Sequence, residues 1–229
     1  DGIRQVLLSE GVPAEHVVCV HSSVDTERYR PGGDRAWLRR EFGLAEDELA
    51  VAMIAQFIER KGHKTLFDAI PAILARHPRT RFLLFGQGPL LEPYRQLVEE
   101  RGLAERVQLP GFRNDLDRIL PCLDLVVHPA FMEGLGVSLL QAAACGVPIV
   151  AARAGGIPEA VRDGVNGYLI EPGDSAALAE RAIRLLDDPA LRSAFGAAGR
   201  RLVEMEFSID AMAAGNMAVY RAVLGEAVA

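Results

Sequence analysis

The chain has 229 residues, of which half are hydrophobic and 24% are charged. This balance is typical of a folded protein with a substantial core, and it argues against disorder or a small disulfide-stapled scaffold. The net charge of −6 and the lack of a long basic run argue against an extended anion-binding surface, so nucleic acid is not expected as a partner.

The first 33 residues differ from the rest of the chain. Residues 2–9 have the pattern of a helix, and residues 17–20 form an apolar run that predicts a strand. A segment rich in charge and turn formers follows, through Gly33. We therefore expect residues 1–33 to be the tail of a preceding domain plus a linker.

From residue 34 to 207, short apolar runs alternate with amphipathic helical stretches, which predicts βαβ units and a parallel sheet. Strands are expected at residues 49–56, 81–85, 107–109, 125–128, 148–151 and 167–170. Helices are expected at residues 62–76 (bent at Pro71), 90–101, 116–120, 137–144, 157–162, 175–186, 189–204 and 210–224. The candidate capping residues are Asn114 or Asp115, Asp174 and Ser208. The predicted fold class is α/β, a Rossmann-like doubly wound parallel six-stranded sheet of order 3-2-1-4-5-6.

Cysteine usage and hydropathy indicate the compartment. Cys19, Cys122 and Cys145 lie far apart and form no CxxC pair, which favours small apolar side chains in a reducing, cytoplasmic environment. No stretch approaches the roughly 18 apolar residues of a membrane span, and no signal peptide is recognisable. Because the chain begins at Asp1 rather than Met, we expect a piece of a longer or processed protein.

In such a sheet, ligands bind beyond the carboxyl ends of the strands where the strand order reverses, between strands one and four. The loop after strand one carries Arg60 and Lys61, and the loop after strand four carries Glu133, Gly134 and Gly136 ahead of a helix. A helix N-terminus binds anions, and a lysine neutralises them as a point charge. A carboxylate instead suits hydroxyl groups. The two loops therefore predict a ligand with a phosphate centre and a polyol end, such as a nucleotide sugar.

Each of these features also has a structural interpretation. A Lys-Gly pair at a helix start is more often a solvated turn than a site. The glycine pairs at residues 86–88 and 155–156 suit either a tight turn or a ligand loop. A histidine that ends a buried strand, such as His128, is more often structural than catalytic. Since His21, His63 and His77 show no ligand spacing with carboxylates or cysteines, no metal site is predicted.

The sequence resembles the donor-site signature of retaining glycosyltransferases of family 4, which have the GT-B fold. The signature is a Glu, seven residues and a second Glu, followed by a run that ends in Ala-Cys-Gly-x-Pro-Val-Val-Ala. Here it corresponds to residues 133–151. Residues 24–31, 61–62, 86–90 and 155–174 also match the family in order and spacing. The resemblance is to the C-terminal, nucleotide-sugar donor domain and covers essentially the whole chain.

The resemblance implies roles for individual residues. Lys61 would hold the donor diphosphate, and Glu133 would bind hydroxyls of the transferred sugar, which makes these two the candidate catalytic residues. The remaining implied donor contacts are the backbone of Gly134, Leu135, Gly136 and Val137 at the phosphates, Gln141 at the ribose, and Gly111, Phe112 and Arg113 beside the base. Transfer would retain the anomeric configuration without an obligatory metal or a cofactor, from a UDP- or GDP-linked donor.

Two positions depart from the family pattern. Gln56 replaces the usual arginine five residues before the lysine, and Arg60 is a candidate for the missing cation. Gln141 replaces the second Glu of the signature, and a neutral acceptor there weakens ribose binding by about 1 kcal/mol.

The resemblance also implies the domain organisation. Residues 1–33 would close an N-terminal acceptor domain, residues 34–207 would form the donor domain, and residues 208–229 would be a helix that crosses back. Without the acceptor domain, the chain is expected to bind donor but turn over poorly. Apolar surface on residues 17–20 and the last helix is expected to favour self-association, and a peripheral membrane location is one option for the full-length protein.

Two alternative functions stay open: a catalytically degenerate binding or regulatory domain, and a sugar-nucleotide epimerase of the same architecture. The base, the sugar and the acceptor are not specified by the sequence.

Overall fold

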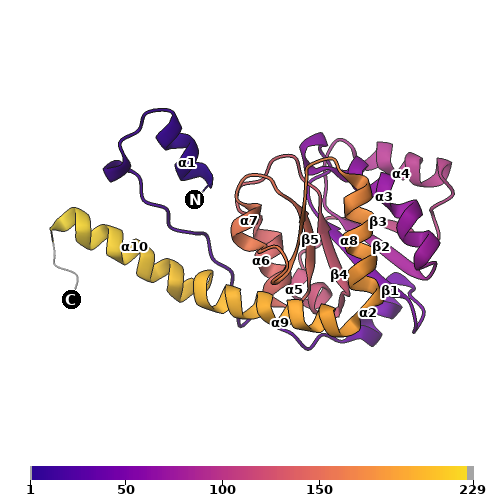
Figure 1. The fold of residues 1–229 in the computed structure, drawn as a ribbon. Helices are drawn as coiled ribbons and strands as arrows, with labels where there is room; N and C mark the ends of the chain where they lie inside the picture. Colours follow the sequence, from indigo (N-terminus) through magenta and orange to yellow (C-terminus); the bar gives the residue numbers. More distant parts are fainter. Residues whose placement is uncertain (1, 226–229) are drawn as a thin grey trace.

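The computed structural model describes residues 2–225 and contains a six-stranded sheet in the order β3-β2-β1-β4-β5-β6 (Figure 1). Every neighbouring pair of strands is parallel. The strands are β1 (Leu49–Ile54), β2 (Thr80–Phe85), β3 (Val107–Gly111), β4 (Leu125–His128), β5 (Ile149–Ala152) and β6 (Gly167–Ile170). The fold class and the strand order predicted from the sequence are thus confirmed.

Helices cover both faces of the sheet (Figure 1). The face that carries α3, α4 and α8 buries alternate strand residues such as Val51 and Met53, and the opposite face buries Ala50 and Ala52. The helices are α1 (Gly2–Ser9), α2 (Arg35–Phe42), α3 (His63–Arg76), α4 (Leu91–Glu100), α5 (Leu116–Ile119), α6 (Val137–Ala144), α7 (Ile157–Ala160), α8 (Ser175–Asp187), α9 (Pro189–Glu206) and α10 (Ile209–Leu224). Short 3₁₀ turns lie at η1 (Ala14–His16), η2 (Glu59–Lys61) and η3 (Leu120–Cys122).

The predicted helix caps are partly confirmed. The Asp174 carboxylate accepts a hydrogen bond from the Ala177 N–H, and the Ser208 hydroxyl accepts one from the Ala211 N–H. Asp115 precedes α5 but does not cap it with its side chain, because its carboxylate binds the Arg113 guanidinium instead. Asp115, one of the two predicted residues, is therefore the N-cap residue of α5 but does not cap it with a side-chain hydrogen bond.

Two elements differ from the predictions. Residues 17–20 form no strand, because this apolar segment lies apart from the sheet and has no neighbouring strand to pair with. Helix α2 was not predicted, since its eight residues include three arginines and bury only Leu38 and Phe42. It is capped by Asp34 and ends at Gly43 in the left-handed conformation.

The end of the chain runs back past its beginning. Helix α10 continues from α9 and extends beyond the sheet toward α1 (Figure 1). None of its described residues is buried. The crossing is anchored where the Val24 N–H donates to the Phe207 carbonyl over 2.9 Å. Within residues 2–225, no helix combines the length and apolar character needed to span a bilayer.

Candidate functional site

The site is built where the loops after β1 and β4 meet, since these two strands are neighbours at the centre of the sheet. Gly62 lies between η2 and α3 with a φ of +74°, and a Cβ atom there would lie 1.8 Å from the Pro129 carbonyl oxygen. Only glycine allows this approach. The Phe131 N–H also donates to the Arg60 carbonyl over 2.8 Å, so backbone contacts hold the two loops together.

Two side chains and one backbone N–H converge on the Glu133 carboxylate in this crevice. The Lys61 Nζ lies 2.6 Å from Glu133 Oε2, and His128 Nε2 lies 2.9 Å from the same oxygen. The other oxygen, Oε1, accepts from the Gly134 N–H over 3.0 Å. Hydrogen bonding from His128 and from Lys61 outweighs burial and lowers the pKa of Glu133 to about 2, so the carboxylate is charged at neutral pH.

A cavity of about 430 Å³ opens beside Lys61 and Glu133. Its lining includes Arg60, Lys61, Glu133 and Gly134, together with the Gly155–Gly156 turn. Gly155 has a φ of +53°, and a Cβ atom there would lie 1.9 Å from the Glu133 carbonyl oxygen. The glycine pair therefore packs directly on the backbone that carries Glu133. Helix α1 also contributes to the cavity wall through Gly2, Ile3 and Val6.

The N-terminus of α6 lines a neighbouring cavity of about 340 Å³, formed in part by residues 133–137. Gly136 is the N-cap residue of α6 and has no side chain to cap the N–H groups of the first turn. A helix N-terminus with free N–H groups attracts an anion. The predicted phosphate-facing backbone, Gly134 to Val137, thus surrounds a cavity that shares Glu133 and Gly134 with the 430 Å³ cavity.

A third cavity, of about 220 Å³, lies at the carboxyl ends of β1 and β2 and includes Gln56, Phe112 and Arg113. Phe112 is 66% exposed. The Arg113 guanidinium binds Asp115 and Glu41, and these hydrogen bonds raise its pKa above the usual value. Gly111 ends β3 immediately before this wall.

The structure does not bring all the predicted residues together. Gln56 lines the cavity with Phe112, whereas Arg60 lines the one with Lys61. Gln141 lies in the second turn of α6, half-buried, and is outside the described residues that line the three cavities.

Sequence reasoning missed two features of this region. His128, interpreted as structural, contacts Glu133, and its position at the end of the strand that precedes Glu133 is the signal that could have indicated this. Cys19, His21 and Glu159 place potential metal-ligating atoms within 4.8 Å of one another at the wall of the 340 Å³ cavity. Spacing could not reveal this cluster, because Glu159 is 138 residues from His21 in the chain.

Comparisons with known proteins show the family to which the chain belongs. The model of the family described as glycosyl transferases group 1 matches residues 34–202. The chain is 35% identical over 202 residues to a GDP-mannose-dependent monoacylated alpha-(1-6)-phosphatidylinositol monomannoside mannosyltransferase of Corynebacterium glutamicum, covering 83% of this chain and 52% of the relative. The chain spans about half the length of the curated relatives it matches.

Solved structures are also similar. HepE of Anabaena in complex with UDP-glucose has a TM-score of 0.85 and 26% identity, covering 97% of this chain and 61% of that one. The C-terminal domain of the glycosyl transferase group 1 protein LpcC from Francisella tularensis has a TM-score of 0.73 and 26% identity. That comparison covers 81% of this chain and 99% of the solved domain.

Proposed function

The chain belongs to the glycosyl transferases group 1, and from this premise we propose that it binds a nucleoside diphosphate sugar and presents the sugar for retaining transfer. The observation that carries the proposal is the 2.6 Å contact between Lys61 and Glu133, beside the N-terminus of α6. One cation, one carboxylate and a helix N-terminus are thereby grouped in a single crevice. They match the diphosphate and the hydroxyls of such a donor.

In this proposal Lys61 changes partner when the donor binds. Without donor, its ammonium group is neutralised by Glu133. A diphosphate carries more charge than one carboxylate, so it attracts Lys61, while Glu133 keeps its bond to His128 and accepts from the sugar hydroxyls. The leaving diphosphate is stabilised by Lys61, by Arg60 and by the dipole of α6, so the mechanism we propose needs no metal ion.

The nucleotide would extend from the diphosphate toward the 220 Å³ cavity, where Phe112 offers a ring for the base. A relative in Corynebacterium glutamicum is named as GDP-mannose-dependent, and HepE of Anabaena was solved with UDP-glucose. We therefore propose a UDP- or GDP-linked donor. We further propose that another domain of the full-length protein binds the acceptor, and that this chain alone turns over poorly.

Calorimetric titration with UDP, GDP, UDP-glucose and GDP-mannose tests the proposal. We expect one nucleotide series to bind, with unchanged affinity in EDTA. The substitution Lys61→Ala is expected to weaken binding by about 2–3 kcal/mol, roughly a hundredfold. Lack of binding by all four compounds at millimolar concentration would contradict the proposal.

A further inference from the structure

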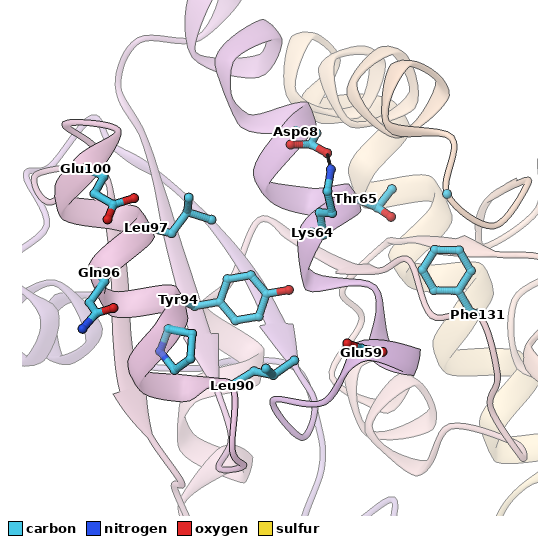
Figure 2. A pocket seen from close by; sticks show the side chains of 12 residues that line it. Glu59, Lys64, Thr65, Asp68, Leu90, Tyr94, Gln96, Leu97, Glu100 and Phe131 are labelled. Carbon is cyan, nitrogen blue, oxygen red and sulfur yellow. Dashed lines mark hydrogen bonds and ion pairs between the residues drawn. The ribbon is translucent and has the colours of Figure 1, made fainter.

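A larger cavity, of about 690 Å³, lies between α3 and α4, outside the proposed donor site (Figure 2). Its volume is in the range typical of small-molecule sites. Figure 2 shows side chains from α3, α4, η2 and the loop after β4 around it. The last two elements also carry the donor-site residues. Glu59 precedes Lys61 by two residues, and Phe131 precedes Glu133 by two.

Two aromatic rings form opposite walls of this cavity (Figure 2). The Tyr94 ring stacks on the buried Phe67 ring at a centroid distance of 5.0 Å and an interplanar angle of 3°, so core packing fixes its position. Phe131 is 51% exposed and borders Gly173, where a Cβ atom would lie 3.3 Å from its ring. An exposed aromatic side chain opposite a fixed one provides apolar surface for a flat, partly apolar ligand.

The charged groups around the rings exclude anions. Carboxylates of Glu59, Asp68 and Glu100 line the cavity, and Lys64 is the cation among its lining residues. Lys64 is itself paired with Asp68 (Figure 2). Among the described residues, Glu59 and Glu100 form no ion pair. A phosphate or a nucleotide would meet uncompensated negative charge here, whereas a hydroxyl group would find acceptors.

We infer that this cavity binds a neutral saccharide, a segment of the acceptor remote from its reacting end, held behind the loops that present the donor, while the other domain binds the reacting end. The C–H face of a sugar ring packs against aromatic rings, and its hydroxyls donate to carboxylates, which is the combination that Tyr94, Phe131, Glu59 and Glu100 supply. The inference rests on the proposed function for the role of the saccharide as acceptor. The binding itself is a separate property of the cavity.

Saturation-transfer NMR and calorimetry on the full chain test this, with maltose, cellobiose, α-1,6-mannobiose and diacetylchitobiose as probes. We expect at least one of these disaccharides to bind at millimolar concentration. Phe131→Ala and Glu100→Gln should each weaken that binding about fivefold or more, and both should leave nucleotide affinity unchanged. Both positions are exposed, and thermal unfolding checks that each variant folds.

Phe112→Ala is the matched control, because Phe112 is also an exposed phenylalanine and lies on the proposed base cavity. It should weaken nucleotide binding and leave disaccharide binding intact. The inference is overturned if no disaccharide binds, if Phe131→Ala leaves binding unchanged, or if choline binds in preference and identifies a cation site. Nucleotide binding without disaccharide binding would overturn only this inference. The reverse result would overturn the proposed function, and with it the acceptor role, but would leave saccharide binding by the cavity standing.

Discussion

At the scale of single residues, the site depends on how Glu133 is held. Lys61 and His128 share its Oε2 atom, and in the proposed function only Lys61 changes partner when a diphosphate binds. His128 is fully buried at the end of β4, so its hydrogen bond does not compete with solvent. In the proposed function, it is therefore the contact that keeps Glu133 oriented toward a bound sugar.

Substitution of His128 should affect recognition of the sugar rather than the nucleotide. In His128→Phe, the advantage of the nucleotide sugar over the bare nucleotide is expected to fall roughly tenfold, because a hydrogen bond to a charged group is lost. His128→Gln keeps an N–H donor and should retain part of the advantage. Calorimetry with UDP against UDP-glucose, or GDP against GDP-mannose, measures the ratio. Equal losses for both ligands would mean that His128 supports the fold only.

His63 should make the protein sensitive to mild acid. Burial, with smaller contributions from His128 and Lys61, lowers its pKa to about 4. Neither ring nitrogen has a partner among the described residues, and the ring stacks on Phe57 at 4.4 Å. A lowered histidine pKa gives stability that is full above the unfolded value of 6.5 and is lost as the pH falls toward 4.

The substitution His63→Phe should remove this dependence. Wild-type protein is expected to lose roughly 2 kcal/mol of unfolding free energy between pH 7.5 and pH 4.5, and the variant should lose less over the same interval. Urea denaturation at both pH values provides the measurement. Parallel losses in the two proteins would show that other groups cause the acid sensitivity.

The sequence predicted those parts of the site that follow from residue type and strand order together. Lys61 and Glu133 could be paired in advance, because adjacent parallel strands bring their carboxyl-end loops together. The contact of His128 with Glu133 depends on a rotamer, and the Cys19–His21–Glu159 cluster depends on how a distant segment folds back. Neither kind of information is contained in residue spacing.

At the scale of secondary structure, the strands were predictable because buried parallel strands are continuous apolar runs. Each lies within two residues of its expected bounds. The apolar run at residues 17–20 was wrongly predicted to be a strand. An apolar run indicates that a segment packs against other residues, but it does not indicate that the segment pairs with a strand, and this one pairs with no strand of the sheet. Helix α2 was missed because its arginines mask its short apolar stripe.

The junction between η2 and α3 offers a test of how the loops define the site. Gly62→Ala would place a Cβ 1.8 Å from the Pro129 carbonyl oxygen and force the Lys61 turn away from β4. We expect a loss of about 3 kcal/mol in unfolding free energy together with weaker donor binding. Gly43→Ala is the control, because Gly43 has a similar φ of +63° but open space around it, and it should cost only about 1 kcal/mol. Equal destabilisation would mean that backbone strain alone, and not contact with Pro129, makes glycine necessary.

At the scale of the whole molecule, both faces of the sheet are covered by helices, whereas α10 is largely exposed (Figure 1). Helix α10 exposes Met217, Tyr220, Val223 and Leu224, the last two by 81% and 72%. One side of α10 (Gly215, Ala218, Val219 and Ala222) and residues 18–20 line an apolar groove of about 340 Å³. Apolar surface of this kind favours association over exposure to water.

We therefore predict that the chain self-associates through α10. Size-exclusion chromatography with light scattering should show a mass that rises with concentration, and Val223→Glu should shift the protein toward monomer because it places a charge in the apolar face. Val165→Glu is the matched control, since Val165 is 52% exposed but lies on the loop before β6, far along the chain from α10. A concentration-independent monomer for the wild-type chain would contradict the prediction. An equal response of both variants would mean that the added charge, and not a change in the α10 surface, causes the dissociation, and it would contradict association through α10.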